Sequence, residues 1–167
     1  MIFMGRAWVF GDDIDTDVII PVRFCISTDP DEFGKHCMEG IDPDFPKKIA
    51  RGDIIVAGKN FGCGSSREPA PISIKAAGIS CVIAGTFARI FYRNAFNVGL
   101  PLLECADASV EIREGDEIEV NINTGEILDV SADKNFNAKP IPPFMQELIR
   151  DNGLMNHLAK KMALRKQ

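Results

Sequence analysis

Residues 53–84 read DIIVAGKNFGCGSSREPAPISIKAAGISCVIA and carry the pattern that decides the fold. The runs at 53–57 and 80–84 are continuous apolar stretches of strand length, which predicts two strands buried on both faces. Between them, residues 70–77 favour a helix that ends at Gly78, because glycine is common just beyond a helix end. The stretch therefore predicts a right-handed strand–helix–strand unit with parallel strands.

The flanking sequence extends this unit. Residues 2–10 read as another strand, and residues 87–98 read as a second helix that leads to a short strand at 101–104. Asp29 and Pro30 suit the start of a helix over about 31–38, and residues 40–46 read as a loop rich in Asp and Pro. We therefore expect an α/β fold around a parallel layer.

The last third of the chain has a different pattern. Residues 116–122 alternate polar and apolar side chains, and a turn at Gly125 leads into a similar run at 126–130, which predicts a β-hairpin and hence a second β layer. Two short helices are expected at 144–149 and 154–163. We expect a single domain over residues 1–167, with C-terminal helices from about residue 143.

Composition narrows the class of protein. A chain of 167 residues that is 46% hydrophobic can form a core without disulfides. Its cysteines number five, and an odd count without a secretory signal favours reduced thiols. No pair has the C-x-x-C spacing that would indicate a metal or redox site. No apolar run approaches the ~18 residues of a membrane helix, and the first residues lack a secretory signal pattern. We expect a cytoplasmic protein with no membrane partner.

Charge is unevenly distributed along the chain. The total of −5 argues against nucleic acid as a partner. Residues 59–97 carry five Lys or Arg against Glu68 alone, a net +4 that leaves −9 on the remainder. This basic segment indicates a local anion site, although solvated helix faces would give the same count.

The loop at 58–67, GKNFGCGSSR, is the strongest candidate for that site. Its glycines allow close backbone approach, Ser65 and Ser66 are expected at or near the N-cap of the following helix, and Arg67 offers a fork for a carboxylate. The strand-to-helix edge of an α/β layer is a frequent ligand crevice. The spacing matches neither nucleotide-binding glycine motif. A glycine-rich turn with an ordinary cap is the alternative.

Four carboxylates lie within six positions, at Asp12, Asp13, Asp15 and Asp17. The segment lacks the central glycine and the terminal glutamate of a calcium-binding loop. Local hydrogen bonds in a turn, or contacts to a partner, are favoured over a metal site.

Three motifs together resemble a known family. They are GDDIDTDVIIP at 11–21, GKNFGCGSSRE at 58–68 and SCVIAGTFARIFYRNAFNVGLPLL at 80–103. In this order they resemble the small subunits of 3-isopropylmalate dehydratase and homoaconitase, which are aconitase-type hydro-lyases. The resemblance implies the swivelling β/β/α domain of the aconitase C-terminus, a malate-type substrate, and a large partner subunit. A [4Fe-4S] cluster is expected in that subunit, with no cofactor bound by this chain.

The resemblance also implies residue roles. Ser65 is similar to the serine that, as an alkoxide, removes a carbon-bound proton. Ser66 and Arg67 resemble the groups that bind a substrate carboxylate, together with loop backbone N–H groups such as that of Gly64. A guanidinium ~4 Å from an alkoxide would attract it by about 4 kcal/mol at an effective dielectric constant of ~20.

Ile26 lies in the segment that resembles the family's substrate-selecting loop. Homoaconitase-like members have an arginine at this position, which can pair with a third carboxylate. Isoleucine favours an apolar substituent instead, so isopropylmalate is the expected substrate, with citramalate, 2,3-dimethylmalate or homoaconitate as alternatives. Ile26 would equally suit a role in packing the loop alone.

Two positions depart from the family pattern. Pro69 replaces a histidine that usually follows SSRE, and Cys25 replaces a larger apolar residue. Proline is acceptable in a first helical turn, but a polar group near the site is lost. A non-catalytic binding subunit is therefore a further alternative. We also expect isolated chains to self-associate through the surface that docks the large subunit.

Overall fold

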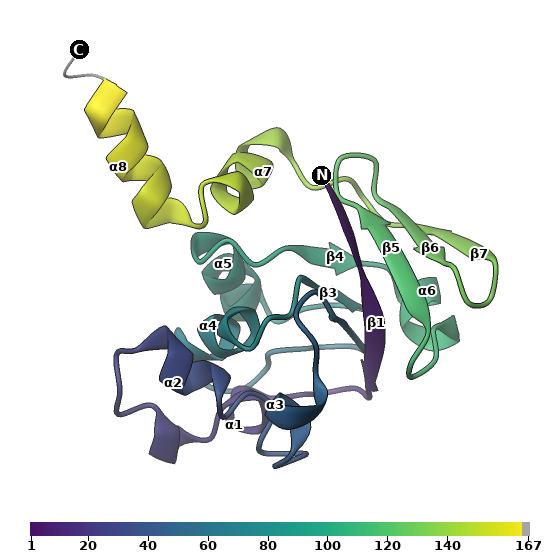
Figure 1. Cartoon of the computed structure of the whole chain (residues 1–167), viewed down its shortest axis with the longest axis horizontal. Helices are drawn as coiled ribbons and strands as arrows, with labels where there is room; N and C mark the ends of the chain where they lie inside the picture. Colours follow the sequence, from purple (N-terminus) through teal and green to yellow (C-terminus); the bar gives the residue numbers. More distant parts are fainter. Residues whose placement is uncertain (165–167) are drawn as a thin grey trace.

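The computed structural model describes residues 1–164 as one curled seven-stranded sheet with helices packed against it (Figure 1). The strand order is β4-β3-β2-β1-β5-β6-β7. The strands are β1 (Ile2–Phe10), β2 (Ile54–Ala57), β3 (Cys81–Ala84), β4 (Leu102–Glu104), β5 (Glu117–Asn121), β6 (Glu126–Asp129) and β7 (Lys134–Asn137). The α-helices are α1 (Thr16–Ile19), α2 (Pro30–Gly34), α3 (Phe45–Lys48), α4 (Pro69–Ala76), α5 (Arg89–Asn97), α6 (Ala106–Glu111), α7 (Pro143–Arg150) and α8 (Leu154–Leu164), and η1 (Val22–Phe24) is a 3-10 turn.

Strand β1 joins two kinds of pairing. Its first half pairs antiparallel with β5, and its second half, from Ala7 to Phe10, pairs parallel with β2. Strands β2, β3 and β4 continue the parallel side. Every residue of β2 and β3 is buried, as their continuous apolar runs predicted. The expected second β layer is the antiparallel part of this same sheet.

Helix positions follow the sequence closely near the site. Helices α4 and α5 begin and end within two residues of the predicted bounds. Asp29 caps α2 by accepting a hydrogen bond from the Asp31 amide, but α2 ends at Gly34, earlier than the predicted residue 38. Met38 has a positive φ of 58° and its amide donates to Ile19 O, so the chain turns back onto α1.

The sequence did not predict five short elements, which are α1, η1, α3, α6 and β7. Helix α6 and strand β7 are short and largely polar, so they show little periodicity, and α3 begins inside the region expected to be loop. In β7 only Phe136 is buried. Hydrogen bonding to β6 defines β7 as a strand, which a single-sequence pattern cannot reveal.

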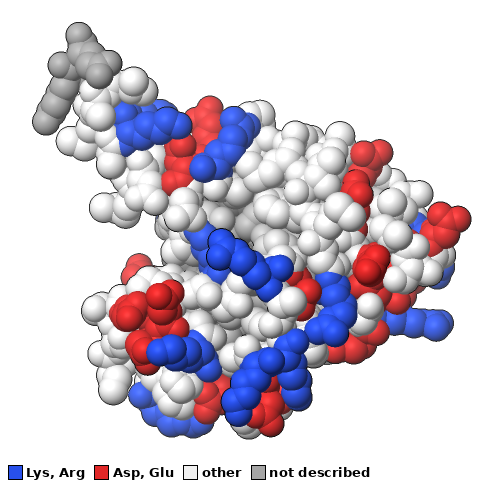
Figure 2. Space-filling view, viewed as in Figure 1, with Lys and Arg blue, Asp and Glu red and all other residues white. Residues whose placement is uncertain are grey.

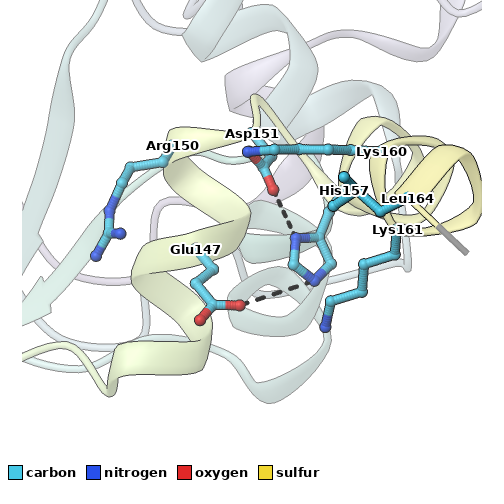
Figure 3. A pocket seen from close by; sticks show the side chains of 7 residues that line it. All are labelled: Glu147, Arg150, Asp151, His157, Lys160, Lys161 and Leu164. Carbon is cyan, nitrogen blue, oxygen red and sulfur yellow. Dashed lines mark hydrogen bonds and ion pairs between the residues drawn. The ribbon is translucent and has the colours of Figure 1, made fainter. Parts of the chain in front are cut away.

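Helix α8 projects from the body of the molecule beyond α7 (Figure 1). His157, which is 4% exposed, holds it in place: Nδ1 donates to Asp151 Oδ2 over 2.6 Å, and Lys160 pairs with the same carboxylate at 2.8 Å (Figure 3). The hydrogen bond from Lys160, and secondly the one from His157, lowers the pKa of Asp151. The other ring nitrogen of His157, Nε2, is buried without a hydrogen-bond partner among residues 1–164, and the nearest acid, Glu147, lies 3.9 Å away. Within residues 1–164, no helix is both long and apolar enough to cross a membrane.

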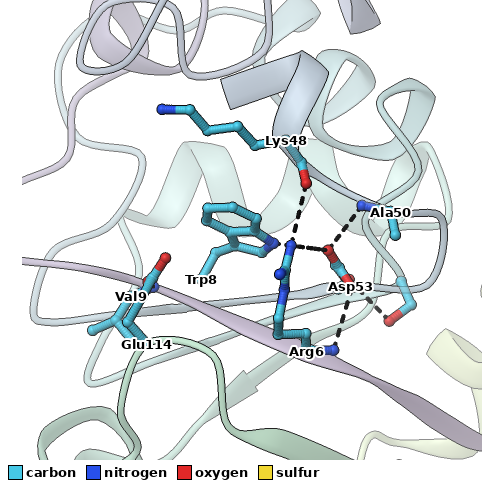
Figure 4. A network of polar contacts seen from close by, with 8 residues as sticks. Arg6, Trp8, Val9, Lys48, Ala50, Asp53 and Glu114 are labelled. Carbon is cyan, nitrogen blue, oxygen red and sulfur yellow. Dashed lines mark hydrogen bonds and ion pairs between the residues drawn. The ribbon is translucent and has the colours of Figure 1, made fainter. Parts of the chain in front are cut away.

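A buried carboxylate fixes β1 to the chain that precedes β2. Asp53 is 5% exposed, and its oxygens accept hydrogen bonds from Trp8 Nε1 at 2.8 Å, the Ala50 amide at 2.9 Å and the Arg6 amide at 3.3 Å (Figure 4). The Arg6 guanidinium lies 3.7 Å away. A buried charge with several donors is well compensated, and the donors in turn depend on it.

Replacement of Asp53 by alanine should therefore destabilise the fold by about 3 kcal/mol, because it leaves buried donors unpaired. Urea unfolding monitored by circular dichroism measures this effect. Glu114→Ala is the matched control, since Glu114 also accepts a β1 amide, that of Val9 at 2.6 Å, but is exposed. Water can replace that acceptor, so the control should cost less than ~1 kcal/mol. Equal losses in both variants would contradict the role assigned to Asp53.

Candidate functional site

The loop at 58–67 lies at the carboxyl ends of the parallel strands and is hydrogen-bonded on both sides. On one side, Gly58 N donates to Gly11 O and Gly62 N donates to Ile14 O, over 3.1 and 2.7 Å. On the other side, Phe61 N donates to Thr86 O over 3.0 Å. The loop therefore joins the segments that follow β1 and β3, at the edge where the sequence predicted a ligand crevice.

The acidic segment supports this loop. Asp12 Oδ1 accepts from the Lys59 amide at 2.7 Å, and Asp13 Oδ1 accepts from the Asn60 side chain at 2.8 Å. Asp15 accepts from the Val18 amide and caps α1. One of the expected local turn bonds is thus present, while Asp12 and Asp13 reach across to the loop. Within the described chain, no three His, Cys, Asp or Glu residues gather in a way that could hold a metal.

A hollow of about 300 Å³ opens beside the loop. It brings together four of the residues that the sequence singled out, with Thr16 from the acidic segment and part of α5. Its lining residues are Thr16, Gly62, Gly64, Ser65, Ser66, Arg67, Ala88, Arg89, Ile90, Phe91 and Asn94. Ser65 and Ser66 are exposed, so their hydroxyls can reach a bound molecule.

The backbone of the loop is suited to an anion. Among residues 1–164, none of the backbone N–H groups at 64–67 donates a hydrogen bond within the chain. Gly64 has a positive φ of 87°, and consecutive N–H groups in such a turn form an anion-binding concavity. The geometry therefore supports the anion site that the sequence predicted.

The expected N-cap role of Ser65 and Ser66 is wrong. Helix α4 begins at Pro69, its N-cap is Glu68, and no side chain caps it. Pro69 favours the first helical position because proline lacks an N–H. Further back in the loop, the Ser65 carbonyl accepts a hydrogen bond from the Thr16 hydroxyl at 2.9 Å. The free amides thus belong to the loop before the helix. Pro69 fits the first turn as the sequence analysis expected.

Arg67 is held by an acidic neighbour. Its Nη1 lies 2.5 Å from Asp17 Oδ1 and 3.2 Å from Ile20 O. The Arg67 guanidinium lowers the pKa of Asp17, and Asp17 raises the pKa of Arg67. Because the pKa of Asp17 is lowered, the pair is intact at neutral pH, and its contribution is lost only as the pH falls through that lowered value. Asp17 therefore orients Arg67 and offsets its charge.

Ile26 does not line the hollow. It follows the 3-10 turn η1 and is 91% exposed. Its segment is nevertheless anchored beside the site, because Arg67 donates to the Ile20 carbonyl just before this turn. The chain alone leaves the Ile26 side chain in solvent and does not pack it.

Arg89 and Asn94 are lining residues that the sequence did not identify. Both belong to α5, and both fall in the basic segment that the charge count had indicated. Only the packing of α5 against the loop shows that they share a hollow with Ser65.

The cysteines do not suit an iron–sulfur cluster. Burial raises the pKa of Cys37 and Cys81 to about 12, so neither is a ready thiolate ligand. The described residues also contain no grouping of three potential ligands. A cluster implied by the family resemblance has no matching donor set here.

The family model of the aconitase C-terminal domain matches residues 26–108, a range that contains the glycine-rich loop and the start of α5. The small subunit of 3-isopropylmalate dehydratase from Syntrophus aciditrophicus is 62% identical over 96% of this chain and 98% of its own length. The isopropylmalate/citramalate isomerase small subunit of Methanocaldococcus jannaschii is 57% identical over 97% and 96%.

A crystal structure of 3-isopropylmalate dehydratase from Methanocaldococcus jannaschii has a TM-score of 0.94 and 48% identity, covering 99% of this chain and 98% of that one. The expected β/β/α fold is therefore confirmed. The chain belongs to the family of 3-isopropylmalate dehydratase small subunits.

Gly62 is the loop position where a side chain should be least tolerated. Its φ is +78°, and a Cβ there would lie 2.1 Å from the Phe91 ring. Gly62→Ala should destabilise the fold by about 3 kcal/mol, from left-handed backbone strain plus overpacking. Gly115→Ala is the control, because Gly115 has φ +89° but open space around it, so about 1 kcal/mol is expected. Thermal unfolding measures the destabilisation of both variants. Equal destabilisation would show that the Phe91 ring does not limit the side chain at position 62.

Proposed function

We propose that this chain is the small subunit of a heteromeric hydro-lyase that isomerises 2- and 3-isopropylmalate by dehydration and rehydration in leucine biosynthesis. The observation that carries the proposal is the exposed Ser65 in a loop of free backbone amides, beside Arg67. Full-length relatives with 53–62% identity are named as small subunits of this dehydratase.

Ser65 acts as the base in this proposal. Its alkoxide takes the carbon-bound proton of the substrate as the C–O bond on the adjacent carbon breaks, and it returns the proton in rehydration. The partner's cluster would supply the Lewis acid that accepts the leaving hydroxyl, so that proton and hydroxyl are both returned, in exchanged positions, over one turnover. An alkoxide forms only where its charge is stabilised. The unpaired N–H groups at 64–67 supply that stabilisation, and they carry much of it because Asp17 offsets the charge of Arg67. Ser66, Gly64 and Arg67 bind the adjacent carboxylate.

The apolar side chain of Ile26 guides the choice of substrate. An exposed isoleucine on a segment anchored beside Arg67 can cover an apolar substituent, whereas it offers no partner for a third carboxylate. Isopropylmalate is therefore proposed first. Citramalate is the second candidate, since one relative at 57% identity is named an isopropylmalate/citramalate isomerase. 2,3-Dimethylmalate and homoaconitate rank below these.

The proposed partner is a large subunit that carries the [4Fe-4S] cluster. Ser65 and Ser66 are exposed, and Ile26 lies in solvent, so a second chain has to close the site before water is excluded. The relatives' names as small subunits support a larger partner. Within residues 1–164, no three potential ligands gather in a way that could hold the cluster.

Self-association of isolated chains is also part of the proposal. Met155, Leu158 and Met162 form a stripe on α8 and are exposed by 78%, 45% and 62%. Figure 2 shows α8 projecting with uncharged and basic atoms on its surface. An unpaired apolar stripe on a projecting helix favours contact with another chain.

Ser65→Ala should lower turnover by about 10²–10⁴-fold in the chain reconstituted anaerobically with its large subunit, because the base is removed. The assay follows 3-isopropylmalate, citramalate, 2,3-dimethylmalate and homoaconitate in parallel. Ser109→Ala is the control, since Ser109 lies on α6, away from the hollow, and its hydroxyl donates to Ala106 O. Full activity of the Ser65 variant would remove the catalytic role and favour a non-catalytic binding subunit.

Ile26→Arg should reduce kcat/KM for isopropylmalate by roughly 10-fold or more and raise it for homoaconitate, because the new guanidinium can pair with a third carboxylate. Val22→Arg adds the same charge at an exposed position of the same segment and should leave the ratio unchanged. An unchanged preference in the Ile26 variant would exclude it as a selecting residue.

A further inference from the structure

Arg89 occupies a distinctive position in the hollow. It is the first residue of α5, which follows β3 and begins at the same sheet edge as the serine loop. Ala88 N donates to Phe61 O over 2.9 Å, so the start of α5 is fixed to the loop by the backbone. Arg89 therefore faces the same 300 Å³ space as Ser65 and Arg67 from a rigid element.

The two arginines of the hollow differ in their charge balance. Arg67 pairs with Asp17 at 2.5 Å. Arg89 has no carboxylate within 4 Å in the part of the chain that the structure describes, and its side chain makes no hydrogen bond there. The uncompensated positive charge of the lining thus belongs to Arg89. Its place in the first turn of α5 adds the positive end of that helix.

The proposed substrate carries two carboxylates, and each needs a partner when water leaves the site. A buried carboxylate without one is costly. In the proposed function, Ser66, Gly64 and Arg67 account for one of them. Among the described residues that line the hollow, the cation not already committed to an acid is Arg89, and a guanidinium can hold a carboxylate with two parallel hydrogen bonds.

We propose that Arg89 binds the second carboxylate of the dicarboxylate substrate, and that Asn94 orients it. This inference rests on the proposed function, because it assumes a malate-type substrate in this hollow. Asn94 is half-buried on the same helix, lines the hollow, and has no hydrogen-bond partner for its side chain among residues 1–164. Its amide can donate to a carboxylate oxygen that the Arg89 fork leaves free.

The test uses the chain reconstituted with its large subunit and compares Arg89→Met and Arg89→Lys with the natural sequence. Loss of a charge-assisted pair should raise KM for 3-isopropylmalate by about 10–100-fold, with a smaller change in kcat. Lysine should restore part of the loss, because it keeps the charge without the fork. Arg93→Met, one turn along α5 and outside the hollow lining, should behave as the natural protein does.

A set of three inhibitors separates binding from a structural role. Isopropylsuccinate keeps both carboxylates, and its two monoamides each lack one. The natural enzyme should bind the diacid more tightly than either monoamide. Arg89→Met should bind the diacid and one of the monoamides about equally, while it still discriminates against the other. A variant that merely loosens the fold would weaken all three inhibitors together.

Three outcomes would overturn the inference. One is an unchanged KM and unchanged inhibitor ratios in Arg89→Met. A second is equal loss for all three inhibitors. The third is failure of Arg89→Met to co-elute with the large subunit, which would make Arg89 a docking contact. In each case Ser65→Ala remains inactive if the proposed function holds. An active Ser65→Ala enzyme would refute the proposed function itself.

Discussion

The glycine-rich loop is held by backbone hydrogen bonds to the chain on both sides, and the candidate site depends on this constraint. Gly62 N bonds to Ile14 O, and Phe61 N bonds to Thr86 O. Gly62 must also leave room for the Phe91 ring, which packs against Phe61 beneath the loop. With residues 58–62 fixed in this way, the next residues extend past the sheet edge with their amides free.

Charge in the hollow is arranged by the same contacts. The acidic segment lies against the loop, where Asp12 and Asp13 bond to it and Asp17 pairs with Arg67. This pairing orients one guanidinium and neutralises it locally. The start of α5 then brings a second guanidinium, that of Arg89, without an acidic partner in the described chain. The hollow therefore presents unpaired amides on one side and an unpaired guanidinium on the other, an arrangement that favours an anion.

Much of the fold could be predicted because its local signals agree. The apolar runs of β2 and β3 and the glycines that follow α4 and α5 each indicated one structure. The predictions were wrong where tertiary contacts decided the outcome. The helix begins at Pro69 with Glu68 at its N-cap, so the two serines lie too early in the chain to cap it. Strand β7 exists because β6 provides its partner.

The sequence by itself determined the parallel layer, the family and the serine loop, because these rest on local periodicity, turn chemistry and motifs that are contiguous in the chain. Only the tertiary structure decided which groups share the hollow. Arg67 and Asp17 are fifty positions apart, and Arg89 lies on a helix after another strand. Their meeting depends on the sheet order and on the packing of α5 against the loop, and no local pattern encodes either.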